Sequence, residues 1–118
     1  MTKEELINRT KIFAHRSVKL ALALPKNTLG SHIQIQLIRC STSVAANYRA
    51  ACIAQSKKSF IAKLSIVIEE SDKSIFWLEF ISDEELIKFE LLKPLLKESK
   101  ELTSIFIASR KTMTNSKY

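Results

Sequence analysis

The chain is almost devoid of the residues that make tight turns. Its 118 residues include a single glycine, Gly30, and two prolines, Pro25 and Pro94. Hairpins and sheets need a turn every ten residues or so, and glycine, proline and asparagine form most of those turns. A shortage of them favours a small number of long helices. The sequence therefore predicts an all-α protein, and its length fits one domain, residues 1–118, with a core of its own.

Apolar residues recur at helical spacing in four stretches with recognisable boundaries. Thr2 and Glu5 form a capping box at the start of the first stretch, and Pro25 ends it. Ser56 is placed to cap the third helix, and Pro94 predicts a kink or a restart inside the fourth. We expect an up-down-up-down four-helix bundle with helices over residues 2–24, 31–55, 56–81 and 83–112, the last with Glu84 and Glu85 near its start.

The second and third predicted helices are apolar on more than one side. A helix of this kind must be covered on both sides, and one bundle core covers only one of them. Large apolar side chains outside the core are typical of subunit interfaces, although a central third helix would bury them within one bundle. We therefore predict self-association through the following residues: Ile35, Ile38, Ile66, Phe76, Trp77 and Phe80.

Lysine and arginine are concentrated in the N-terminal part of the chain. From Leu6 to Ile68 there are ten of them and no acidic residue, whereas residues 69–118 hold ten acids against eight bases. A folded protein with one cationic region attracts polyanions, above all nucleic acid. The structural alternative is ordinary solvated helix surface. The candidate nucleic-acid contacts are a cluster around the turn between helices two and three and a stripe on helix one: Arg49, Lys57, Lys58 and Lys63, and Arg9, Arg16 and Lys19.

Four polar side chains on the second predicted helix share one strip between its two apolar sides: Gln36, Arg39, Ser43 and Asn47. We interpret this strip as a structural seam that fixes the register of the bundle. Ser43 and Asn47 would bond across to helix three, and Arg39 would pair with a carboxylate such as Glu70. Contact with a ligand is the functional alternative.

No pattern in the chain predicts catalysis, a metal site or a cofactor. His15 and His32 have no cysteine or aspartate at metal-ligand or triad spacing, so we interpret both as surface histidines. Cys40 and Cys52 on one helix would lie roughly 18 Å apart, too far for a disulfide. No signal peptide or membrane-spanning segment is evident. We therefore expect a non-enzymatic, soluble cytoplasmic protein with reduced thiols and no membrane partner.

The middle of the chain resembles a known family. The segments that carry the resemblance are Gln36-x-x-Arg39, Ser43-Val-Ala-Ala-Asn47-Tyr-Arg49-Ala, Ser56-Lys-x-x-Phe60-Ile-x-Lys63-Leu, Ile68-Glu-Glu70 and Trp77-Leu-Glu79. They are similar to bacterial four-helix-bundle proteins related to the intervening-sequence proteins encoded within 23S ribosomal RNA genes. The Glu-Gly pair usual near Arg49-Ala50 is absent. The resemblance implies a homopentameric barrel, kinship with the basic accessory protein of the reverse transcriptase in diversity-generating retroelements, and no enzymatic role.

Two hypotheses about function follow. The first is a cationic homo-oligomer, a pentamer by the family resemblance, that binds RNA or DNA or a nucleic-acid-processing protein. In that case Arg110, Lys111 and Lys117 in the basic tail would add to the binding. The second is an oligomeric adaptor for another protein with no nucleic-acid role.

Overall fold

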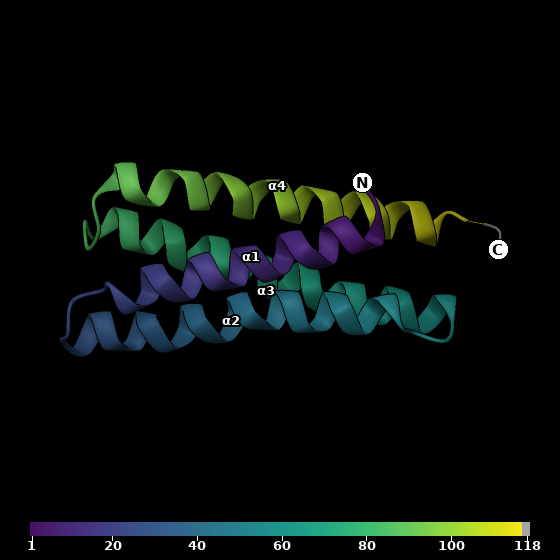
Figure 1. Cartoon of the computed structure of the whole chain (residues 1–118), viewed down its shortest axis with the longest axis horizontal. Helices are drawn as coiled ribbons and strands as arrows, with labels where there is room; N and C mark the ends of the chain where they lie inside the picture. The colour runs from purple at the N-terminus through teal and green to yellow at the C-terminus, as the bar shows by residue number, and fades with distance from the viewer. Residues whose placement is uncertain (117–118) are drawn as a thin grey trace.

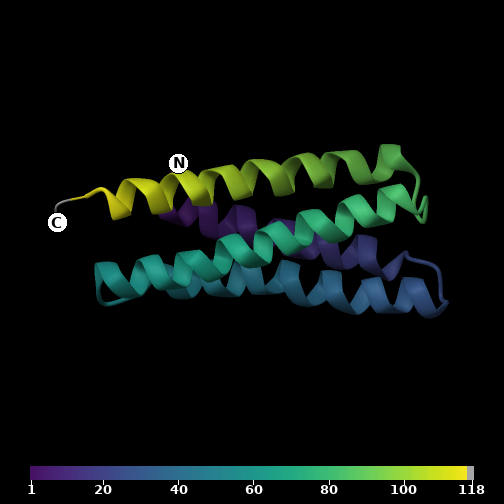
Figure 2. The same ribbon diagram turned by 180° about the vertical axis from the view of Figure 1, so that it is seen from behind.

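The computed structural model describes residues 1–116 and consists of four helices joined by short turns. These are α1 (Lys3–Leu22), α2 (Thr28–Cys52), α3 (Lys57–Asp83) and α4 (Phe89–Thr114). Successive helices run in opposite directions, and α1 begins at the end of the bundle where α4 finishes (Figures 1 and 2). The bundle measures 50 × 21 × 20 Å. The predicted all-α, up-down-up-down four-helix bundle is therefore confirmed.

The helix starts follow local capping chemistry. The capping box of Thr2 and Glu5 is present, and the Ser56 hydroxyl accepts a hydrogen bond from the Ser59 backbone N–H, as predicted. Helix α2 begins at Thr28, three residues earlier than expected, because the Asn27 side chain caps it by accepting from the Gly30 N–H. Only glycine fits at this position, since an added Cβ would lie 1.9 Å from the carbonyl oxygen of Pro25.

The connection from α3 to α4 differs from the prediction. Helix four begins at Phe89, so the expected start at residue 83 is wrong. Instead α3 runs to Asp83, and Glu85 takes the left-handed conformation, with φ 53°. The Leu86 N–H donates to the Ile81 carbonyl and the Glu85 N–H to the Ser82 carbonyl, which is the hydrogen-bond pattern of a Schellman cap. The acidic residues that suggested a helix start therefore lie in the turn that ends α3.

Pro94 lies inside α4 without dividing it. Proline removes one backbone donor, and in the second turn of a helix this costs a single hydrogen bond to the preceding turn.

The core combines aliphatic and aromatic side chains with a layer of small polar ones. Its largest fully buried members include Phe13, Ile33, Leu78 and Phe106. Between α3 and α4 the hydroxyls of Ser71 and Thr103 share a hydrogen bond, and between α3 and α2 the Ser74 hydroxyl donates to the Cys40 sulfur at 3.3 Å. Small polar residues allow these backbones to approach closely, and their hydrogen bonds offset the cost of burying hydroxyls.

Helices α1 and α4 share the fewest contacts of the four neighbouring pairs, whereas α2 packs closely on both α1 and α3. The α1–α4 seam is therefore the least closely packed side of the bundle.

Candidate nucleic-acid interface

Positive charge is concentrated at the end of the bundle that carries the chain termini. Three segments converge there: residues 1–11, 49–63 and 107–116. They hold nine lysines and arginines against two acidic residues, and one of the nine, Arg9, is bonded to Glu98 outside these segments. The segments that meet at the opposite end, residues 16–35 and 75–94, hold five bases against five acids. We call the first region the basic end. The antiparallel packing turns the asymmetry along the sequence into an asymmetry along the bundle axis.

The predicted cluster around the second turn lies in the basic end. Arg49 and Lys58 are exposed, whereas Lys57 and Lys63 are half-buried. The Lys57 ammonium donates to the Ser116 carbonyl, so it also links the start of α3 to the residues that follow α4.

Three further cations belong to the same region. The Lys3 ammonium lies 5.6 Å from the centre of the Phe60 ring. The Arg110 guanidinium donates to the Ser65 hydroxyl at 3.4 Å, and Lys111 is exposed. The expected contribution of Arg110 and Lys111 is thus compatible with where they lie, and Lys117 is outside the described residues.

Arg9 has a different role from its neighbours. Its Nε and Nη2 atoms donate to the two carboxylate oxygens of Glu98 at 2.7 and 2.6 Å, and Glu101 lies 3.8 Å away. The hydrogen bond to Glu98 raises the pKa of Arg9, and the same bond lowers the pKa of Glu98. Because its guanidinium is already paired in a bidentate fashion, Arg9 joins α1 to α4 and offers little to a phosphate.

Arg16 and Lys19 also lie apart from the basic end. They are exposed on the second half of α1 and line a cavity of about 310 Å³ with Leu20, Leu91 and Leu95 at the α1–α4 seam. The seven predicted contacts therefore divide into four at the basic end, one clamp between helices and two near the opposite end.

A groove between α1 and α2 is the surface feature that the sequence did not reveal. It has a volume of about 530 Å³ and a floor that includes Ala14, Ala45 and Ala46. Lys11, His15 and Arg49 also line it. The small residues of helix two, which allow close approach of another helix, were the only available signal, but which helix they face depends on packing.

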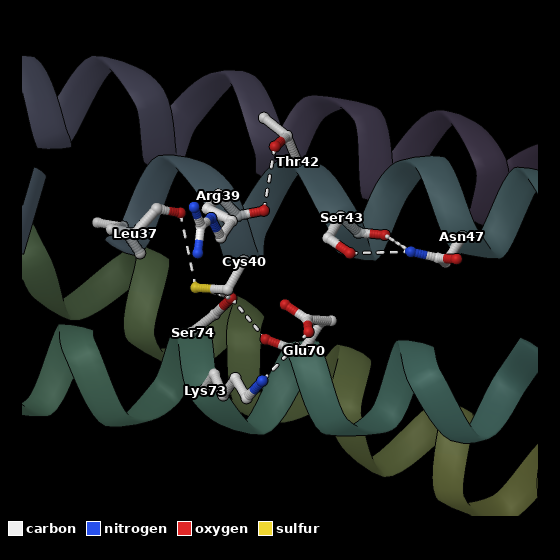
Figure 3. A network of polar contacts seen from close by, with 9 residues as sticks. All are labelled: Leu37, Arg39, Cys40, Thr42, Ser43, Asn47, Glu70, Lys73 and Ser74. Atoms are coloured by element: carbon white, nitrogen blue, oxygen red, sulfur yellow. Dashed lines mark hydrogen bonds and ion pairs between the residues drawn. The ribbon is translucent and has the colours of Figure 1, made fainter. Parts of the chain in front are cut away.

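The polar strip on α2 makes bonds different from those expected (Figure 3). The Asn47 amide donates to the Ser43 hydroxyl at 2.8 Å and to its carbonyl at 3.0 Å, both within α2. Glu70 pairs with Lys73, one turn along α3, at 3.3 Å. The predicted Ser43 and Asn47 bonds to helix three and the predicted Arg39–Glu70 pair are therefore wrong, because Asn47 bonds to Ser43 and Glu70 pairs with Lys73, each on its own helix. Gln36 is half-buried and Arg39 is exposed.

The six predicted interface residues occupy two separate sides of the molecule. Ile35, 58% exposed, and Ile38 lie on α2, whereas Ile66, Phe76, Trp77 and Phe80 lie on α3. Ile38, Trp77 and Phe80 are half-buried against the core, so burial within one bundle accounts for part of their area. Phe76 is 53% exposed and Ile66 41%. The rings of Phe76, Trp77 and Phe80 pack together at centroid distances of 4.9 to 6.0 Å, with Trp77 edge-on to both phenylalanines.

Neither histidine takes part in a site of catalytic form. His15 and His32 are exposed, as predicted, and His32 lies edge-on to Trp77 at 5.6 Å. Among residues 1–116 no group of three His, Cys, Asp or Glu side chains is placed to hold a metal ion.

Cys40 and Cys52 are both free, and burial raises the pKa of the Cys40 thiol. Over the same residues, no helix is long and apolar enough to cross a membrane.

The model of the 23S rRNA-intervening sequence protein family matches residues 2–108. The chain belongs to this family. A solved structure supports the assignment: a protein of unknown function from the S23 ribosomal protein family of Bacteroides thetaiotaomicron superposes with a TM-score of 0.85 at 31% identity. The match covers 94% of this chain and 99% of that one. No functionally curated protein matches this member of the 23S rRNA-intervening sequence family.

Proposed function

We propose that this member of the 23S rRNA-intervening sequence family is a non-enzymatic, self-assembling bundle that binds nucleic acid through its basic end. One observation carries the proposal: apart from Arg9, which is paired with Glu98, the segments that converge where α1 begins and α4 finishes hold eight lysines and arginines against two acids. The remainder of the molecule is close to electrically neutral. A concentrated positive field of this kind attracts a phosphate backbone and supplies the non-specific part of binding.

Self-assembly would strengthen this field. The family resemblance implies a ring of five chains, in which each basic end is repeated around the axis. Large apolar side chains left in solvent, Phe76 and Ile35 among them, support association of some kind. Because a diffuse cluster of surface lysines and arginines contacts mainly the phosphate backbone, we expect binding to depend weakly on sequence and steeply on salt.

The test uses a charge-reversal pair and a matched control. Lys58→Glu with Lys111→Glu changes two exposed cations of the basic end, whereas Lys88→Glu with Lys93→Glu makes the same charge change at the opposite end. Binding of fluorescent RNA and DNA oligonucleotides is measured by anisotropy at low and raised salt. We expect the first pair to weaken binding by at least about tenfold. The slope of log affinity against log salt concentration should also become shallower, by the amount that corresponds to the loss of roughly two phosphate contacts. Equal losses from the two pairs would refute the placement of the interface.

An oligomeric adaptor for a protein partner is the alternative. The aromatic cluster of Phe76, Trp77 and Phe80, in which Phe76 is exposed, favours it, because such clusters form the centres of protein interfaces. It predicts an assembled particle, seen by light scattering, that is indifferent to both nucleic acids.

A further inference from the structure

Two apolar surfaces on different sides of the bundle differ in shape. The first is the α1/α2 groove, whose floor of Ala14, Ala45 and Ala46 leaves about 530 Å³ open. The second, which we call the α3 patch, consists of the exposed Ile66 and Phe76 and the half-buried Phe80, whose ring lies beside that of Phe76. One surface is a hollow with three alanines among its lining residues, and the other is a patch of large apolar side chains.

The two surfaces also carry opposite charge. Lys11, His15 and Arg49 line the groove, and α1 beyond Glu5 and all of α2 contain no acidic residue. The α3 patch is flanked by three exposed carboxylates, Glu69, Asp72 and Asp83, which fall on its side of α3 by helical spacing. Lys73 on the same side is already paired with Glu70. Opposite potentials on two complementary surfaces favour one orientation of docking over others.

The accessible surface area of a single chain is large enough for such a contact. The chain exposes 7384 Å², whereas a compact monomer of its mass exposes about 6,500 Å². The excess is comparable to the roughly 800 Å² that each partner buries in a standard interface. The elongated shape and the uncovered apolar side chains both contribute to this excess.

We propose that the α3 patch of one copy docks into the α1/α2 groove of the next copy. This inference rests on the self-assembly in the proposed function and names the two surfaces that it uses. Because the contact joins different surfaces, each added copy presents a free groove and a free patch until a ring closes. Phe76 inserts against the alanine floor, and the carboxylates beside it meet Lys11 and Arg49.

The experiment uses two variants that each block one surface. Ala46→Glu places a carboxylate on the groove floor, and Phe76→Glu removes the central ring of the patch. Both positions are exposed, so neither substitution enters the core. Ile12→Glu, at an apolar position 48% exposed on another side of α1, is the matched control. Masses are measured by light scattering for each variant alone and for the two mixed, and circular dichroism checks the helical content.

We expect each blocking variant alone to be a monomer and the control to remain assembled. An equimolar mixture of the two should form a dimer and nothing larger, because only one intact groove and one intact patch can meet. A monomeric mixture would overturn the pairing in favour of a contact between identical surfaces. If the wild type assembles and the two blocking variants assemble as well, the choice of surfaces is overturned, whereas self-assembly itself stands. A monomeric wild type would overturn self-assembly itself, while leaving the oligonucleotide measurements to judge the basic end.

Discussion

The clamp between Arg9 and Glu98 closes the seam with the fewest contacts, and its strength follows from its geometry. Two parallel hydrogen bonds of 2.6 and 2.7 Å join side chains that are 25% and 16% exposed. Exposed ion pairs contribute about 0.2 to 1 kcal/mol to stability, and hydrogen bonds to charged groups about 1.5 to 3 kcal/mol. Partial burial and bidentate geometry place this pair near 2 kcal/mol, which corresponds to a fall in Tm of roughly 8 °C for a chain of this length.

The assay is a double-mutant cycle. Arg9→Met keeps most of the aliphatic stem and removes the charge, and Glu98→Gln keeps the shape of the side chain. Thermal and urea unfolding of the wild type, both single variants and the double variant give the coupling energy. We expect about 1.5 to 2 kcal/mol. A coupling below about 0.5 kcal/mol would show that the pair behaves as an ordinary surface ion pair and would refute the clamp.

The pH dependence gives an independent check on the same pair. The bond to Arg9 lowers the pKa of Glu98 in the folded protein relative to the unfolded chain. The stabilisation is therefore complete above the ordinary pKa of glutamate and is lost as the pH falls through the depressed folded value. The Glu98→Gln variant should lack this acid-labile component. Arg9→Met should also leave RNA affinity nearly unchanged, in contrast to Lys58→Glu with Lys111→Glu, because the Arg9 guanidinium is already occupied.

Three other predictions concern single positions. Gly30→Ala should lower the free energy of unfolding by more than about 2 kcal/mol in urea titrations, because the new Cβ would meet the backbone of Pro25 at 1.9 Å. Glu85→Gly should raise it by about 0.5 to 1 kcal/mol, since glycine adopts φ 53° without strain, and an unchanged midpoint would argue against the cap. The half-buried Cys52 thiol should react with a maleimide in the native state, whereas buried Cys40 should be protected until the protein unfolds, as followed by mass spectrometry after peptide digestion.

Local chemistry in the sequence was sufficient for most of the fold. The capping box at Thr2 and the cap at Ser56 act within four residues, so their positions could be predicted without knowledge of the rest of the chain. The start of α4 could not be predicted from local chemistry. Glu84 and Glu85 have the composition of a first helical turn, yet the backbone there forms the left-handed cap of α3. Because αL at a non-glycine residue carries a conformational cost, only the packing of α3 against α4 explains it.

By itself the amino-acid sequence determined the all-α class, four long antiparallel helices and the excess of cations before residue 69, because turn frequency, apolar period and charge are properties of short stretches. The tertiary structure alone decided which cations act together. It gathered Arg49, Lys58 and Arg110 at one end and paired Arg9 with a carboxylate 89 residues away. It also separated the apolar residues of α2 from those of α3 into a groove and a patch. Such partnerships depend on how the helices are rotated against one another, and the packing of the whole core sets that rotation.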